Sequence, residues 1–150
     1  MKIFDRRFAT ELREDLEEDP TWSTDLEAEY SRFVRSEHAP EFFDLCTKGL
    51  RESLFWETDE LSQLWDKGRE EAYLQCFCRQ LYNIESYAYD QLQDIQGIHV
   101  PRLFAHVSLQ TSDKPNEYLD CPGLLLEYID GFQLGDLAEN ATPGYLATRL

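Results

Sequence analysis

The chain has 150 residues, 42% of them hydrophobic, which is enough for one domain with a buried core. Asp and Glu number 30 against 14 for Lys and Arg, so the formal net charge is -16. Such a charge repels nucleic acid and anionic membranes, and no apolar run reaches the ~20 residues of a membrane span. We therefore expect a soluble, cytoplasmic protein with no nucleic-acid partner and no membrane association.

The cysteines and the acidic residues do not predict a metal site. The four cysteines lack the paired spacing of zinc sites, and we expect reduced thiols at all of them: Cys46, Cys76, Cys78 and Cys121. Residues 11–19 are mostly acidic and contain one cation, Arg13. A run of this kind is more typical of a solvated face than of an acidic docking site.

The first part of the chain is predicted to hold a short strand and two helices. Residues 1–4 form the strand, and we expect its upstream part to lie outside this chain. Ser23 or Thr24 can cap a helix, with Glu27 near the position that completes a capping box. Residues 38–40 interrupt this helix, and residues 41–45 form another short one before Gly49.

The strongest periodic signal lies between residues 61 and 95, where there is no proline. Apolar residues recur there at helical intervals: Leu61, Trp65, Ala72, Cys76, Leu81, Ile84, Ala88, Leu92 and Ile95. Gly68 divides this stretch, and Gly97 is placed to end it as a left-handed C-terminal cap. Residues 69–96 are therefore predicted to be the central helix of the domain.

Two strands are predicted after the long helix. Residues 100–109 alternate between apolar and polar side chains, with Pro101 at an edge position near the start. Residues 111–122 form a polar loop, and the apolar run after Gly123 predicts a buried strand over residues 123–129. The two strands are expected to pair as a hairpin, and a short helix is expected over residues 133–139.

Three features could carry chemistry. Glu85 lies on the border of the apolar stripe, where a carboxylate must be solvated or paired. Lys2 is the candidate partner, because a strand packed against the long helix would let its ammonium contact Glu85 and hold phosphates. Beyond Leu126, the connector over residues 127–132 exposes backbone groups that can bind a flat heterocycle. Each feature alone also fits a bland interpretation, a solvated side chain or a plain strand-to-helix junction.

The order of these features resembles the small lobe of the protein-kinase-like fold. The sequence of the matching segments is similar to that of uncharacterised fungal kinase-like proteins. The matching blocks are residues 2–8, 85–97, 100–105 and 123–137. The resemblance implies that Lys2 pairs with nucleotide phosphates and with Glu85, and that Leu126 is the gatekeeper. It also implies that the backbone of Glu127 and Ile129 receives adenine.

The fold implied is α+β and helix-rich, with a small antiparallel sheet of about three strands on one long helix. Residues 1–150 would be a single, incomplete kinase small lobe with a helical, acidic insertion over residues 11–68. The glycine-rich loop, the catalytic loop and the magnesium motif are missing, so we expect at most weak ATP binding, no Mg²⁺ and no kinase activity from this chain alone. The expected partner is a large lobe in a longer product, or another protein.

Two other functions stay open. A non-enzymatic interaction module would use an aromatic groove formed by Trp22, Phe42, Phe43, Phe55, Trp56 and Trp65. Aromatic residues at helical spacing are, however, more typical of a core. Small-molecule phosphotransferases share this lobe, so the acceptor of a longer relative could be a small molecule instead of a protein.

Overall fold

A computed structural model describes residues 1–14, 21–52, 65–110, 116 and 118–130. Within these residues the chain is an α+β structure with four α-helices and a three-stranded antiparallel sheet. The helices are α1 (Thr10–Glu14), α2 (Thr24–Val34), α3 (Ala39–Glu52) and α5 (Lys67–Gln91), with short 3₁₀-helices η1 (Arg6–Phe8) and η3 (Gln93–Ile95). The strands are β1 (Lys2–Ile3), β2 (Leu103–Leu109) and β3 (Cys121–Leu126). No helix in the described ranges is long and apolar enough to cross a membrane.

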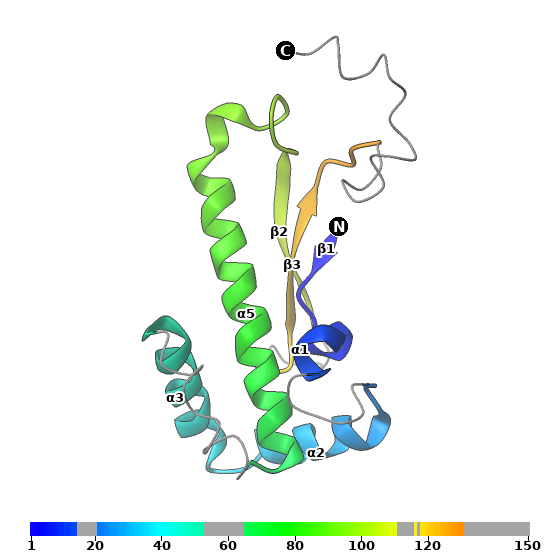
Figure 1. Cartoon of the computed structure of the whole chain (residues 1–150), viewed down its shortest axis with the longest axis vertical. Coiled ribbons are helices and arrows are strands. Elements are labelled where there is room, and N and C mark those ends of the chain that lie inside the picture. Colours follow the sequence, from blue (N-terminus) through cyan, green and yellow to red (C-terminus); the bar gives the residue numbers. More distant parts are fainter. Residues whose placement is uncertain (15–20, 53–64, 111–115, 117, 131–150) are drawn as a thin grey trace.

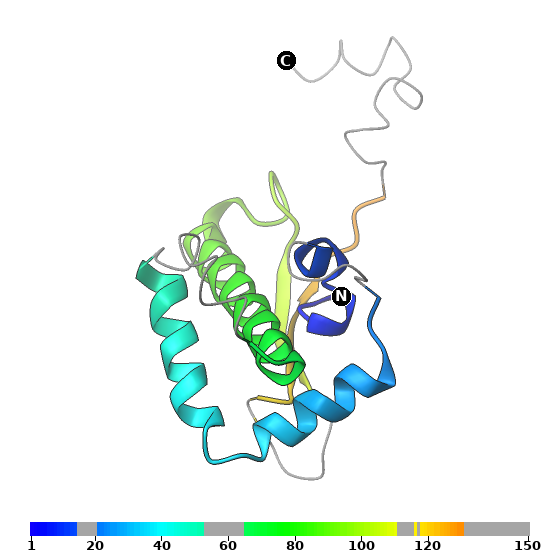
Figure 2. The same ribbon diagram turned by 60° about the horizontal axis from the view of Figure 1, so that its bottom comes forward.

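Helix α5 is the central element of the fold. Figure 1 and Figure 2 show it with the sheet on one side and α3 on the other, while α2 crosses near its N-terminal end. In the sheet, β3 is the middle strand and pairs antiparallel with both β1 and β2. Lys2 and His106 are both Cα partners of Leu124, which is completely buried. This register places Lys2 and His106 on the face of the sheet that α5 covers.

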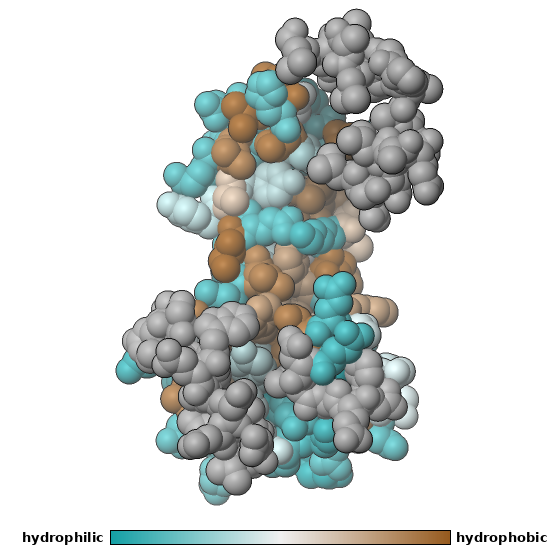
Figure 3. Space-filling view, in the orientation of Figure 1, coloured by the Kyte–Doolittle hydropathy of each residue, from teal (hydrophilic) through white to brown (hydrophobic). Residues whose placement is uncertain are grey.

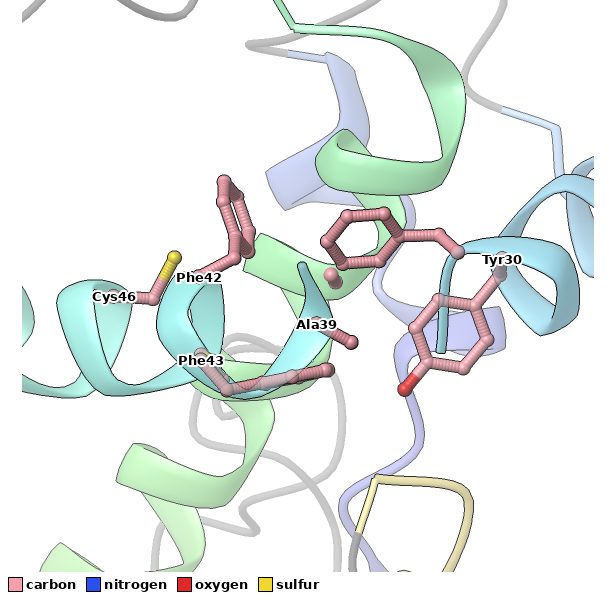
Figure 4. Packing of buried hydrophobic residues seen from close by; sticks show 8 residues of the cluster. Tyr30, Ala39, Phe42, Phe43 and Cys46 are labelled. Atoms are coloured by element: carbon pink, nitrogen blue, oxygen red, sulfur yellow. The ribbon is translucent and has the colours of Figure 1, made fainter. Parts of the chain in front are cut away.

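Most of the core lies between the three longest helices. Its buried members are Tyr30, Phe33, Ala39, Phe42, Phe43, Cys46, Ala72 and Cys76. Figure 4 shows these side chains of α2 and α3 gathered beside α5. A second, smaller cluster of Phe4, Cys78 and Leu124 joins α5 to the sheet. The four cysteines are buried and free, in agreement with the reduced thiols predicted from the sequence: Cys46, Cys76, Cys78 and Cys121.

Helix α3 differs from the short helix predicted over residues 41–45. It begins at Ala39 and continues through Gly49 to Glu52. Pro40 lies in its first turn, where a missing N–H group costs nothing, so the proline begins the helix instead of separating two. Burial of the apolar face against α5 outweighs the cost of about 1 kcal/mol for a helical glycine.

The bounds of helix α5 also differ from the predicted range of residues 69–96. Asp66 caps it by accepting a hydrogen bond from the Arg69 N–H at 2.9 Å, and Gly68 lies inside the first turn and does not divide the helix. The helix ends at Gln91, and η3 follows. Gly97 has the predicted positive φ of 76°, but its N–H donates to the Val100 carbonyl at 2.7 Å and does not cap α5.

The apolar stripe predicted for the long helix is only half correct. Ala72 and Cys76 are buried, whereas Leu81 is 40% and Ile84 57% exposed. In the second half of α5, the side chains that face the sheet carry polar groups. They include Tyr82 and Tyr89, which pack against the cluster around Phe4. The spacing of apolar residues could not reveal this change, because the sheet-facing positions are aromatic or polar.

The strands are displaced from their predicted positions. β2 begins at Leu103, because residues 97–100 form a turn and Pro101 has no N–H for a ladder. β3 covers residues 121–126 instead of 123–129. The Glu127 N–H donates to the Arg102 carbonyl at 2.8 Å, beyond the end of the strand. The predicted hairpin partners do pair, and the strand predicted over residues 1–4 is present but shorter, at Lys2–Ile3.

Two further predictions can be compared with the structure. Ser23 is the N-cap of α2, but Glu27 does not complete a capping box, because its carboxylate contacts the Arg6 guanidinium instead. The insertion predicted over residues 11–68 includes α2, α3 and most of α1. The helix predicted over residues 133–139, and residues 15–20 and 53–64 of the insertion, lie outside the described residues.

Candidate functional site

The structure brings Lys2 and Glu85 into direct contact. The Lys2 ammonium forms an ion pair with the Glu85 carboxylate, although 83 positions separate them in the sequence. The Lys2 side chain is 51% exposed and that of Glu85 27% exposed. The pair therefore lies at the surface, where the ammonium, which has three N–H donors, can reach a second anion.

Local structure on both elements explains this contact. Side chains alternate along β1, so Lys2 and Phe4 extend to the α5 side of the sheet, and the Lys2 ammonium lies 5.1 Å from the centre of the Phe4 ring. On α5, Glu85 is three residues after Tyr82, which packs edge-on against Phe4 with ring centres 5.7 Å apart. The helix period thus places Tyr82 and Glu85 on one face, above the same strand.

A polar contact between α5 and β2 lies beside this pair. His106 Nδ1 on β2 is 3.0 Å from Tyr82 Oη and 3.4 Å from Ser86 Oγ on α5. One turn after Glu85, the pKa of Tyr89 is raised by burial and by the Glu85 carboxylate. These residues fix the distance of α5 from the sheet at the level of Lys2.

The other cations near β1 are already paired. Arg7 forms a salt bridge with Asp5, at 2.6 Å between Nη2 and Oδ2. Arg6 is buried and contacts the carboxylates of both Glu71 and Glu27. Burial alone would lower the pKa of Arg6, but these carboxylates raise it overall, so its charge is fixed and internally balanced. Lys2 is thus the cation of the β1 segment that is half exposed and available to a ligand.

The predicted adenine-binding edge lies at the end of β3. Leu126 pairs with Leu103 of β2 and packs against the cluster of Phe4 and Leu124, on the α5 side of the sheet. Leu126 and Lys2 therefore lie on one face, on neighbouring strands.

Glu127 and Ile129 follow the strand without regular structure. The Glu127 N–H donates to the Arg102 carbonyl, and its side chain accepts a hydrogen bond from the Arg102 N–H at 3.1 Å. A heterocycle at this edge would therefore have to use the Glu127 carbonyl and the backbone of Ile129, whose side chain is 60% exposed. Of the five predicted site residues, Lys2 and Glu85 are in direct contact, whereas Glu127 and Ile129 follow the end of β3.

Sequence reasoning missed Tyr82, Ser86 and His106. The signal is present in the sequence, because Tyr82, Glu85, Ser86 and Tyr89 recur at helical spacing, but a pattern of apolar residues alone does not include them. The aromatic groove of the alternative function is not supported at two of its residues, since Phe42 and Phe43 are in the core. Phe55 and Trp56 lie outside the described residues.

The site contains no cluster of metal ligands: within the described ranges, His, Cys, Asp and Glu side chains do not come together in groups of three or more. In comparisons with protein-family models, curated proteins and solved structures, no match to this chain was found.

Proposed function

We propose that the chain is a kinase-like small lobe in which Lys2, oriented by Glu85, binds the phosphates of a nucleotide such as ATP. The ion pair between these two residues carries the proposal. In protein kinases a lysine on a strand pairs with a glutamate on the neighbouring helix, and the lysine contacts the nucleotide phosphates. The same pair of residue types on the same two kinds of element supports this role.

The position of Leu126 is a second support. It lies on the strand next to Lys2 and on the same face, and the backbone of residues 127–129 continues from it along the open end of the sheet. A nucleotide with its phosphates at Lys2 and its base near Glu127 and Ile129 would follow this edge. The Glu127 carbonyl and the backbone groups of Ile129 would supply its hydrogen bonds.

Phosphoryl transfer by this chain alone is not part of the proposal. The sequence has no G-x-G-x-x-G loop to cover phosphates. Rate acceleration in phosphoryl transfer comes mainly from a positioned base and bound metal ions, which a large lobe would have to supply. We therefore expect ATP binding to be weak, with a dissociation constant of about 1 mM.

Thermal unfolding in the presence of ATP tests the proposal. With several millimolar ATP and a dissociation constant of about 1 mM, binding should stabilise the fold by about 1 kcal/mol and raise Tm by about 3 °C. Lys2→Ala should abolish this shift, whereas Lys48→Ala, which removes the same charge from an exposed position on α3, should retain it. Glu85→Gln should reduce it, because Lys2 is kept but no longer held.

Two ligand controls locate the contact. Inorganic triphosphate should reproduce the part of the shift that depends on Lys2, and adenosine should give a smaller shift that Lys2→Ala leaves intact. If ATP does not stabilise the unaltered protein, or if Lys2→Ala and Lys48→Ala behave alike, the nucleotide proposal is wrong.

A further inference from the structure

A hydrophobic groove lies between α5 and the segment that follows β1. Its apolar lining includes Phe4, Phe8, Ala9, Leu12, Cys78 and Leu81, and its volume is about 480 Å³. We name it the α5 groove. It is formed by the end of β1, by η1 and α1, and by the middle of α5.

The rim of the α5 groove exposes large apolar side chains. Phe8 is 82% exposed and Leu81 is 40% exposed, and Ile84, one turn further along α5, is 57% exposed. Figure 3 shows hydrophobic residues gathered over the middle of α5. Aromatic and aliphatic side chains that are exposed beside a groove are the usual anchors of protein interfaces, because desolvating them drives binding.

The charge beside the groove indicates which charge a partner would carry. Glu11 lines it, and Glu14 follows one turn later on the same helix; both are exposed, and neither forms an ion pair with another described residue. The neighbouring cations do not balance them, because Arg7 pairs with Asp5, and Arg6 and Arg13 pair with Glu71. The rim is therefore negative, in a chain whose formal net charge is -16.

We propose that the α5 groove is a docking site for an amphipathic helix of a partner protein, with apolar residues on one face and Lys or Arg along its flanks. The apolar face would cover Phe8 and Leu81, and the basic flank would approach Glu11 and Glu14. A second copy of this chain is a poor occupant, because two surfaces of the same negative sign repel each other. The proposal does not depend on nucleotide binding.

Fluorescence anisotropy with a labelled synthetic peptide tests this docking site on the full chain. The probe is a helical peptide of about 18 residues with Leu at positions i, i+3, i+4 and i+7 and Lys on both flanks. The first control has the same composition in scrambled order, so it keeps the charge but loses the apolar face. The second control replaces each Lys by Glu. The probe should bind about tenfold more tightly than either control.

Variants of the chain locate the binding site. Phe8→Ser and Leu81→Gln should each weaken binding of the probe by about tenfold, because each removes an apolar anchor. Leu45→Gln, which changes a leucine that is 59% exposed on α3, should leave it unchanged. Glu11→Gln should reduce both the affinity and its dependence on salt. Circular dichroism confirms that each variant remains folded.

Four results would overturn the proposal. The probe could fail to bind at a concentration of about 100 μM. The scrambled or acidic control could bind as tightly as the probe, or Phe8→Ser and Leu81→Gln could bind as tightly as Leu45→Gln. Finally, sedimentation velocity could show a dimer of the unaltered chain that Phe8→Ser dissociates, which would make the second copy the occupant.

Discussion

Arg13 and Glu71 form an ion pair in which both side chains are completely buried, with Arg13 Nη2 2.7 Å from Glu71 Oε1. The second carboxylate oxygen of Glu71 contacts the Arg6 guanidinium, which lies 3.8 Å from the centre of the Tyr30 ring. One carboxylate on α5 thus holds two arginines that follow β1. This network fixes the segment that carries Lys2 against the helix that carries Glu85.

Removing the Glu71 charge should destabilise the fold strongly. Glu71→Gln leaves Arg13 and Arg6 buried without their shared counter-charge, and breaking a buried pair costs about 3–5 kcal/mol. Urea unfolding followed by circular dichroism measures the loss. Glu29→Gln is the control, because Glu29 pairs with Arg32 at an exposed position on α2, where a pair contributes about 0–1 kcal/mol. Equal unfolding midpoints for the two variants would show that the buried network does not stabilise the protein.

Asp5 should make the fold sensitive to acid. Burial alone would raise the pKa of Asp5, but hydrogen bonds from Arg7 lower it overall below its ordinary value of 3.8. The folded state therefore loses this proton more readily than the unfolded state, and the stabilisation is complete above pH 3.8. It disappears as the pH falls through the folded pKa. Asp5→Asn should lower stability at neutral pH by about 1 kcal/mol, because it removes the charge that pairs with Arg7 but keeps a side-chain oxygen that can cap η1.

A pH series of unfolding midpoints checks this prediction. The difference between the unaltered protein and Asp5→Asn should shrink as the pH falls below 3.8. A difference that is constant across the series would mean that the Asp5 carboxylate has the same pKa in both states.

Gly68→Ala distinguishes a helix break from a close helix contact. If Gly68 merely interrupted a helix, alanine would stabilise it by about 1 kcal/mol. In the structure, a Cβ at Gly68 would lie 2.8 Å from Phe33 Cβ and 3.0 Å from the Glu29 carbonyl oxygen on α2. We therefore expect Gly68→Ala to cost about 1–3 kcal/mol by overpacking. Thermal unfolding gives the sign directly, and a higher Tm would contradict the close contact.

The Lys2–Glu85 pair should add little to stability. Its side chains are 51% and 27% exposed, and such surface pairs contribute about 0–1 kcal/mol. A double-mutant cycle with Lys2→Ala and Glu85→Gln should give a coupling energy in that range. If the coupling energy is small, the ion pair contributes little to the fold. Loss of the ATP-induced rise in Tm in Lys2→Ala then reports lost binding and not a damaged structure. A coupling above about 2 kcal/mol would indicate a structural role instead.

The cysteines should be unreactive in the native protein. Burial raises the pKa of Cys78 to about 12, and a contact with Cys76, together with burial, raises that of Cys46. A thiol-specific reagent at about pH 8 should therefore react at least about a hundredfold faster in denaturant than in buffer. Rapid reaction of the folded protein would show that at least one thiol is accessible.

The sequence by itself predicted the elements whose signals are local. Ser23 as a helix cap, the positive φ of Gly97, the long helix and the pairing of the last two strands follow from residue type and spacing over a few positions. The boundaries were less accurate, because they depend on contacts with other elements. Helix α3 continues through Gly49 since α5 covers its face, and β3 ends where Glu127 meets Arg102.

The sequence also suggested Lys2 and Glu85 as partners, from the place of Glu85 beside the apolar stripe and from a family resemblance. It could not show the network around Glu71, because Arg6, Arg13 and Glu71 look like ordinary charged residues until three elements bring them together. Nor could it show that Phe8, Leu81 and Ile84 are exposed, since hydrophobicity predicts burial only on average. Which side chains are buried or joined depends on the packing of α5 against the sheet and α2, a long-range arrangement that local spacing does not contain.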